Sequence, residues 1–275
     1  MMSDSFVHKQ FHNQKELQIL REDNPNFAGT LAKGMMILQC FVSDPRPHAN
    51  SELAKRLGIP RPTISRLCRT LQAMGYLDHD ERLDRYFIGP AIVSLGYPYL
   101  INTPLLNQLR PAMQAMATQM MGAVSIGVAL ESDVVYLESC THEQGTLKRP
   151  AVGAVRGIVE TAMGRAFLAS LDEPALKEKL EMIRLQRPED YHRCLAGVED
   201  SLVQYQKRGF AVNLGDAGLG VLAVGVGSRI RYGSRQLLFN CAVPGYRVKA
   251  QELIKNIGPR LTEMVRMADA QKGLR

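Results

Sequence analysis

The sequence predicts an α+β protein with a small N-terminal domain and a larger C-terminal domain. Before residue 90, three helical patterns are followed by two short strand patterns. After residue 104, strand pairs alternate with helices, which favours an antiparallel sheet. The chain has 275 residues, enough for two hydrophobic cores, and its 45% hydrophobic and 22% charged residues are typical of a globular protein. That composition excludes disordered and collagen-like chains.

The first predicted helix begins after a polar N-terminal segment. Residues 1–26 show no apolar period and contain the turn signal Asn24-Pro25-Asn26, so we expect a mobile arm. An apolar pattern with helical spacing follows and stops before the prolines of Asp44–Pro47. Its members are Leu31, Met35, Leu38 and Val42.

Two further helices and a hairpin complete the N-terminal domain. A helix is predicted over Ser51–Leu57, with Asn50 or Ser51 as N-cap and Gly58 as its stop. Another opens at Pro60-Arg61-Pro62 and continues to Gly75. Two short strands are expected at Tyr76–His79 and Arg85–Ile88, and the charged turn between them is Asp80–Asp84. This order is that of a winged helix-turn-helix, which we assign to residues 27–89.

The segment 90–103 is predicted to be a linker helix that another surface covers. Pro90 can start a helix, and the segment is too apolar for a solvated linker, so a second copy of the chain is a plausible partner. Pro98 should kink this helix or end it early.

The C-terminal domain, residues 104–275, should contain helices packed on an antiparallel sheet. The first helix carries an apolar stripe of Leu105, Leu109, Met113, Met116 and Met120. Strands are predicted at Ala123–Leu130, Val134–Cys140, 219–228 and 235–243. Further helices are predicted near 160–171, 173–186, 194–208 and 248–270.

The third helix carries the chemistry expected of a DNA-binding surface. Its apolar residues, Ile64, Leu67, Cys68 and Leu71, share one face. Its outward residues are Arg61, Pro62, Thr63, Ser65, Arg66, Arg69 and Thr70. From Leu53 to Leu77 there are five basic residues and no acidic one, and the whole chain carries +7. Arginines can neutralise phosphates and read base edges in the major groove. Arginines that merely keep an exposed face soluble are the alternative.

The predicted hairpin offers two more basic residues. Arg82 and Arg85 could contact the DNA backbone or the minor groove, although Asp80, Glu81 and Asp84 lie beside them.

Several motifs resemble the IclR family of bacterial transcriptional regulators. The resemblance is carried by residues 30–41, 51–67 and 71–77, and it extends through Leu95–Tyr97, Val134–Leu137, Thr161–Ala166 and Arg208–Val212. It implies a linker helix between the winged helix-turn-helix and a GAF-like domain, residues 104–275, for effector binding and oligomerisation. It also implies dimers, or dimers of dimers, on a pseudo-palindromic DNA operator, and a small-molecule effector such as an organic or aromatic acid.

The resemblance also indicates where an effector would bind. The matching positions are Val159, Glu160, Thr161, Asn213, Val221, Ala223, Asn240 and Ala242. Several differ from the residues that family members usually carry, so the ligand class is left open. Asn213 and Asn240 could donate to a carbonyl or anionic oxygen, beside an apolar wall of Val221 and Ala242. Arg156 and Arg165 lie nearby in sequence, with a surface role for each as the alternative.

Other classes of protein find little support in the sequence. The five cysteines lack CxxC spacing and suit free thiols in a reducing compartment, and no signal peptide or membrane helix is apparent. We therefore expect a cytoplasmic protein. No metal site, cofactor or catalytic constellation can be assigned, so we expect no enzyme. A ligand-independent repressor or architectural protein, and an enzyme domain joined to a DNA-binding domain, are the alternatives.

Overall fold

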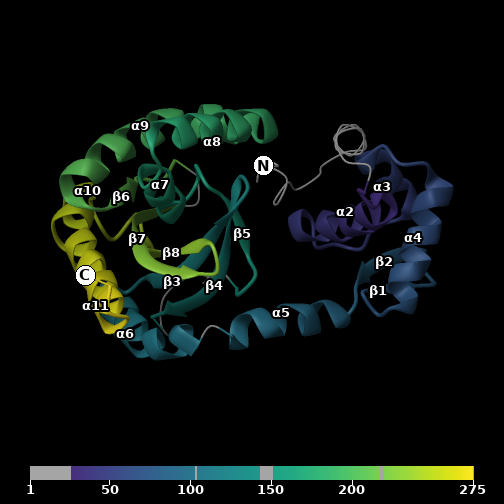
Figure 1. Ribbon diagram of the computed structural model, residues 1–275, viewed down its shortest axis with the longest axis horizontal. Coiled ribbons are helices and arrows are strands. Elements are labelled where there is room, and N and C mark those ends of the chain that lie inside the picture. Colours follow the sequence, from purple (N-terminus) through teal and green to yellow (C-terminus); the bar gives the residue numbers. More distant parts are fainter. Residues whose placement is uncertain (1–25, 103, 143–150, 217–219, 275) are drawn as a thin grey trace. The chain divides into compact units, whose positions relative to one another are not determined.

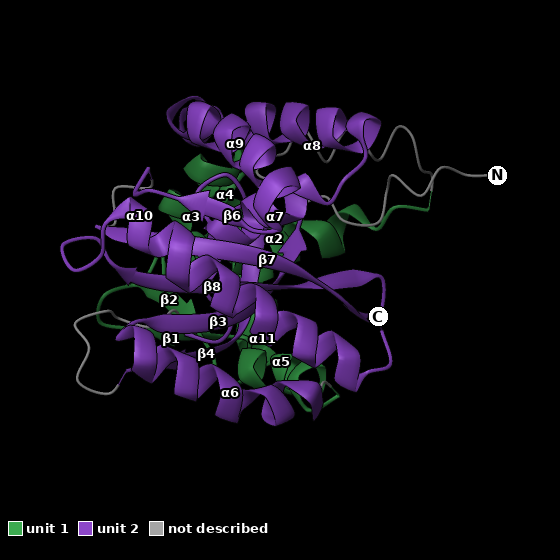
Figure 2. Ribbon diagram, turned by 90° about the vertical axis from the view of Figure 1, so that its left-hand side faces the viewer, with its two compact units in different colours: residues 1–102 green, residues 103–275 purple. Residues whose placement is uncertain are grey.

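The chain divides into two compact units, residues 1–102 and 103–275 (Figure 2). The structure, a computed structural model, describes residues 26–102, 104–142, 151–216 and 220–274. Apart from Asn26, the predicted N-terminal arm lies outside these residues. Each unit is considered by itself below.

The first unit is a winged helix-turn-helix followed by one more helix (Figure 1). Its elements are α2 (Gly29–Ser43), α3 (Asn50–Leu57), α4 (Arg61–Ala73), β1 (Leu77–Asp80), β2 (Arg85–Ile88) and α5 (Ala91–Ile101). The strands form an antiparallel hairpin in which Leu77 pairs with Ile88 and Asp80 with Arg85. The first strand thus begins one residue later than predicted.

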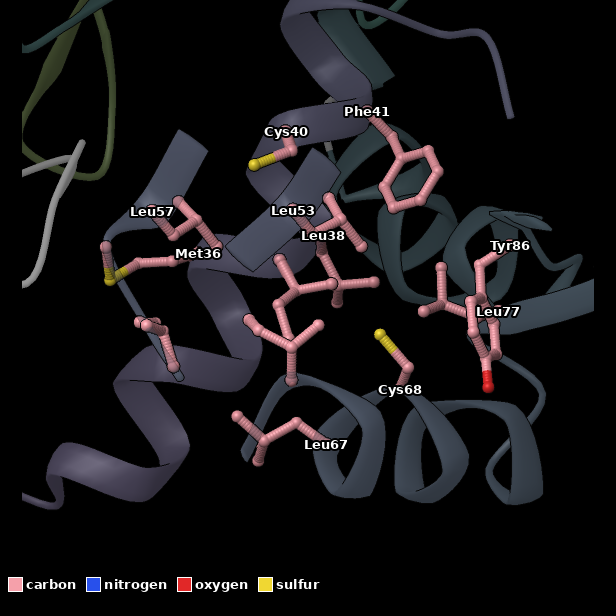
Figure 3. Close-up of a cluster of buried hydrophobic side chains, with 13 residues drawn as sticks. Met36, Leu38, Cys40, Phe41, Leu53, Leu57, Leu67, Cys68, Leu77 and Tyr86 are labelled. Atoms are coloured by element: carbon pink, nitrogen blue, oxygen red, sulfur yellow. The ribbon is translucent and has the colours of Figure 1, made fainter. Parts of the chain in front are cut away.

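The core of the first unit joins its three N-terminal helices to the hairpin (Figure 3). Helix α4 contributes Ile64, Leu67 and Cys68, all buried. Around them pack buried residues of α2, α3 and the strands, including Met36, Phe41, Leu53, Leu57, Leu77 and Tyr86. Burying these apolar side chains fixes the face that α4 turns outward.

Helix α2 buries a different face from the predicted one. Of the four residues that recur at helical spacing, only Leu38 is buried, and Leu31, Met35 and Val42 are exposed. The inward face is formed by Met36, Ile37, Cys40 and Phe41. The helix is apolar on two faces, so the spacing alone did not select the one that packs.

Two local predictions in the first unit also need correction. Helix α3 takes Ala49 as its N-cap, not Asn50 or Ser51, and Glu52 accepts the N–H of Ala49 (2.9 Å). Helix α5 continues through Pro98 to Ile101, so Pro98 does not end the helix at its own position, and the predicted kink stays a prediction. The predicted stop at Gly58 is confirmed, because this residue takes a left-handed conformation (φ 67°) that favours glycine.

The second unit is built on a six-stranded antiparallel sheet, as the α+β prediction requires. The strand order is β5-β4-β3-β8-β7-β6. The bounds are β3 (Ala123–Leu130), β4 (Asp133–Thr141), β5 (Val155–Gly157), β6 (Ala211–Asn213), β7 (Val221–Tyr232) and β8 (Arg235–Pro244). The three-residue strands β5 and β6 were not predicted.

Helices cover both faces of this sheet (Figure 1). One face packs against α6 (Pro104–Met120) and α11 (Gly258–Gln271). The other carries α7 (Ala162–Ala169), with α8 (Glu173–Gln186) and α9 (Pro188–Arg208) beyond it. The predicted stripe of α6 is buried except for Met120, which is half-buried.

Three helices of the second unit have bounds that differ from those predicted. Helix α7 is shorter at both ends than the predicted range 160–171, and α9 begins six residues before residue 194. The predicted last helix is interrupted, because α10 (Ala250–Glu252) passes into a π-helical turn at Leu253–Ile257 before α11 begins.

Candidate functional site

The outward face of α4 forms a polar and basic surface in the first unit. Arg61, Arg66 and Arg69 are exposed, as are Pro62 and Thr70. Thr63 and Ser65 are half-buried beside them. A shallow depression on this face is lined by Pro62, Ser65, Arg66, Arg69, Thr70 and Ala73. The structure therefore brings the six residues predicted on this helix, from Arg61 to Arg69, to its solvent side.

The guanidinium groups on this face are free of carboxylate partners. Within the described part of the chain, Arg61, Arg66 and Arg69 make no ion pair. Many other arginines do, namely Arg46, Arg85, Arg110, Arg165, Arg184, Arg187, Arg193 and Arg266. Unpaired arginines on a helix fixed by its apolar face keep their full charge available to an anionic partner.

The two arginines predicted in the hairpin differ in their surroundings. Arg82 is exposed in the turn, whose backbone is held by Asp80 Oδ1 accepting from the N–H of Arg82 (2.9 Å) and of Leu83 (3.0 Å). Arg85 instead donates to Glu52 Oε2 (2.8 Å) and to the carbonyl of Pro47 (3.2 Å). This ion pair braces the hairpin against α3, which argues against Arg85 as a free phosphate contact.

A second candidate site lies on the face of the six-stranded sheet that α7 covers. Strand register places Asn213, Ala223 and Ala242 in one row across β6, β7 and β8, and Ala123 of β3 continues this row. Val221 lies at the start of β7, opposite Pro244. Because residues two apart along a strand share a face, Asn240 belongs to this surface as well.

Asn240 is the most unusual polar group of this surface. It is 6% exposed, and its side-chain Oδ1 is buried without a hydrogen-bond partner in the described chain. It pairs in register with Gly225 on one side and Ser125 on the other. An unsatisfied buried amide costs about 1–3 kcal/mol, so the site is suited to a polar ligand that supplies the missing bond.

Two serines that were not predicted for this site lie in the same row of the sheet as Asn240. The hydroxyls of Ser125 and Ser139 lie 2.9 Å apart, and both side chains are buried. The register β8-β3-β4 places them beside Asn240. Both serines lie in segments that were predicted as strands, β3 and β4, but only the exact register of these strands shows that the two side chains meet.

The other predicted effector residues with polar side chains are engaged in structural hydrogen bonds or an ion pair. Thr161 caps α7 by accepting the N–H of Gly164 (3.0 Å). Asn213 Nδ2 donates to the carbonyl of Glu160 (2.7 Å), and Asn213 Oδ1 accepts the N–H of Gly215 (2.8 Å). The carboxylate of Glu160 pairs with Arg193 (2.6 Å), and Val159 is part of the core.

The start of α7 lies directly on the sheet beside Asn240. A Cβ atom at Gly225 would collide with the carbonyl of Ala162, so backbone packs on backbone at this point. The positive end of the α7 dipole is therefore held at this face of the sheet. Of the two arginines nearby in sequence, Arg156 is exposed, whereas Arg165 is only 1% exposed and is not a surface charge.

The described ranges also bear on metal sites, reactive thiols and membrane helices. No cluster of His, Cys, Asp or Glu there could hold a metal ion. All five cysteines are buried and free, and burial raises the pKa of Cys68 and Cys241 to about 12. Among the described helices, none combines the length and the apolar character needed to cross a bilayer.

Known proteins match both units. The IclR helix-turn-helix domain matches residues 30–81, and the domain described as bacterial transcriptional regulator IclR C-terminal matches residues 97–270. The chain is 27% identical to the HTH-type transcriptional regulator TsaQ1/TsaQ2 of Comamonas testosteroni, over 92% of this chain and 91% of that protein. It is 26% identical to the p-hydroxybenzoate hydroxylase transcriptional activator of Acinetobacter baylyi, over 91% and 93%.

A solved structure agrees with these matches. The crystal structure of an IclR family transcriptional regulator from Brucella abortus has a TM-score of 0.83 and 30% sequence identity. The match covers 92% of this chain and 95% of that one. The chain therefore belongs to the IclR family of bacterial transcriptional regulators.

Proposed function

We propose that this regulator binds a pseudo-palindromic DNA operator with α4 in the major groove. In this proposal Arg61, Arg66 and Arg69 contact phosphates and base edges, and Pro62, Thr63 and Ser65 lie against the bases or the backbone. The single observation that carries the proposal is the set of three unpaired arginines on the outward face of a helix whose inward face is buried. Arg82 is a secondary contact from the hairpin, whereas Arg85 braces the hairpin through Glu52.

Alanine substitutions on α4 test this placement. An operator fragment is first selected from random-sequence DNA with the wild-type protein, and affinities are then measured over a range of salt concentrations. Arg66→Ala and Arg69→Ala should each weaken operator binding by about 1–3 kcal/mol. If the lost contact is to a phosphate, the slope of the logarithm of the binding constant against the logarithm of the salt concentration should also fall in magnitude by about one. Arg184→Ala is the matched control, because Arg184 lies on α8 in an exposed pair with Glu181. Wild-type affinity in both α4 variants would refute the proposal.

We also propose that the effector is an aromatic acid bound on the α7 face of the sheet. The Asn240 Oδ1 atom, which has no partner among the described residues, can accept a hydrogen bond from a ligand hydroxyl, and the Ser125 hydroxyl can donate or accept one. Ala123, Ala223 and Ala242 present only small apolar side chains in one row, which suits the face of an aromatic ring, and the start of α7 favours a negative charge. The relationship to the p-hydroxybenzoate hydroxylase activator supports an acid of this class and makes 4-hydroxybenzoate the first probe.

The proposed assembly is a homodimer formed through the first unit, alone or as part of a dimer of dimers. Helix α5 is apolar, yet none of its residues is buried, and Val93 is 74% exposed. Leu31 on α2 is 67% exposed. Exposed apolar faces of this kind mark interfaces, and a two-fold dimer matches a pseudo-palindromic operator. A cytoplasmic location follows from binding to DNA, and we propose no enzymatic activity.

A further inference from the structure

Arg165 of α7 is a buried cation with three defined partners. Its Nε donates to the carbonyl of Val159 (3.0 Å), and its Nη1 donates to the carbonyl of Val212 (3.0 Å). Its Nη2 pairs with the carboxylate of Asp216, whose side chain is 25% exposed. The planar guanidinium thus donates to two backbone carbonyls and one carboxylate at once, which an ammonium group cannot do with the same geometry.

These partners belong to the two segments that border the proposed effector site. Val159 precedes the N-cap of α7, and Val212 precedes Asn213 in β6. Asp216 lies three residues beyond Asn213. The hydrogen bond from Asn213 Nδ2 to the carbonyl of Glu160 joins the same two segments a second time. Arg165 therefore fixes the spacing between the segment 158–161 and the segment 212–216.

Helix α9 supports the pair from behind. Ser201 Oγ donates to the same Val212 carbonyl (2.6 Å). Gly197 lies against the ion pair, and a Cβ atom there would collide with Asp216 Oδ2 and Arg165 Nη1. The pair thus occupies space that only a glycine at position 197 leaves open.

We propose that Arg165 and Asp216 are positioning residues that hold the two borders of the effector site in the arrangement that binds ligand. Arg165 is too deeply buried to contact solvent anions, and Asp216 supplies the only carboxylate that it pairs with among the described residues. Removing the charge of Asp216 leaves a buried cation without compensation, so the segment 212–216 loses its hold on α7. A prearranged site binds more tightly because less order is lost on binding.

Hydrogen exchange of the free protein tests the proposal without any ligand. In Asp216→Asn, amide exchange in 158–161 and 212–216 should become about tenfold faster, whereas α8 and the first unit keep wild-type rates. Gly197→Ala should have the same effect through steric displacement of the pair. Arg165→Lys should also have it, because lysine keeps the charge but cannot reach all three acceptors. Glu181→Gln removes an exposed pair with Arg184 and should change none of these rates. Wild-type exchange in the first three variants would overturn the proposal.

Measuring ligand affinity tests the effect of this arrangement on binding. This test rests on the proposed effector site. Calorimetry with 4-hydroxybenzoate should show about a tenfold higher Kd for Asp216→Asn, with unchanged operator affinity in the absence of ligand. Equal Kd values in wild type and Asp216→Asn would overturn the positioning role. If the wild type does not bind 4-hydroxybenzoate, the proposed effector class fails, and the exchange measurement alone decides on Arg165 and Asp216.

Discussion

At the scale of single residues, Glu52 connects three parts of the winged helix-turn-helix. It accepts the N–H of Ala49 at the start of α3, and it pairs with Arg46 (3.2 Å) and with Arg85 of the hairpin (2.8 Å). The hydrogen bond from the Ala49 backbone, followed by the contacts with Arg46, lowers the pKa of Glu52 from 4.5 to about 2. One carboxylate thus holds both the helix start and the hairpin.

The lowered pKa of Glu52 predicts acid sensitivity of the fold. A carboxyl group whose pKa is lower in the folded state stabilises it above the ordinary value of 4.5, and this contribution is lost as the pH falls from 4.5 to about 2. Glu52→Gln should therefore lower the thermal midpoint at pH 7 and flatten its dependence on pH below 4.5. Glu178→Gln on α8 is the control. Parallel acid profiles for wild type and Glu52→Gln would contradict this role.

Replacing Asn240 by an apolar residue should raise the stability of the free protein and weaken ligand binding. Asn240→Leu removes the unsatisfied buried Oδ1 atom while keeping the branching of the side chain, and it should stabilise the free protein by about 1 kcal/mol. The same change should abolish the rise in thermal midpoint that 4-hydroxybenzoate gives to the wild type. Asn256→Leu is the control, because Asn256 is exposed and bonds only to Glu252 nearby. A less stable Asn240→Leu variant that still responds to ligand would argue against the site.

At the scale of elements, the sequence predicts helices best where polarity separates two faces. Helix α4 has apolar residues on one side and arginines on the other, so both its extent and its outward face could be predicted. Helix α2 is apolar on two faces, and only packing against α4 and the hairpin selects Met36 and Phe41 over Leu31 and Met35. Strands β5 and β6 have three residues each, too few to show an alternating pattern.

For the candidate effector site, the resemblance predicts positions, and these stay a prediction, but it does not predict how the residues are bonded. Motif resemblance predicts Asn213 and Asn240 at the site, yet only the fold shows that both side-chain polar atoms of Asn213 have partners and that Oδ1 of Asn240 has none among the described residues. Strand register brings Ser125 next to Asn240. Arg165 reaches the border of the site through its contact with Asp216, which lies 51 residues further along the chain. Such long-range contacts leave no local signal in the sequence.

At the scale of the whole molecule, the DNA-binding unit and the second unit have separate hydrophobic cores. One core lies in the winged helix-turn-helix, and another lies between α7, α8, α9 and the sheet. The exposed apolar residues of α2 and α5 belong to the first unit, so the proposed dimer would join two DNA-binding domains directly. Dimerisation and operator binding should therefore fail together.

Charged substitutions on these faces test the assembly. Leu31→Glu and Val93→Glu should each convert the dimer to a monomer, because a buried unpaired carboxylate opposes association. Light scattering during size-exclusion chromatography measures the mass, and operator affinity should fall in parallel. Leu185→Glu is a matched control, since Leu185 on α8 is 68% exposed, close to the 67% of Leu31. A dimer that persists in both variants would place the interface elsewhere.

The contact between Gly225 and the Ala162 carbonyl limits how ligand preference can change during evolution or engineering. Any larger residue at position 225 would lift α7 from the sheet and disturb Thr161 and Arg165 with it. Ala123, Ala223 and Ala242 lie in one register row on the same face of the sheet, and each added methyl group there would change the surface offered to a ligand by a small step. A biosensor library for new aromatic compounds should therefore vary these three alanines and leave the glycine intact.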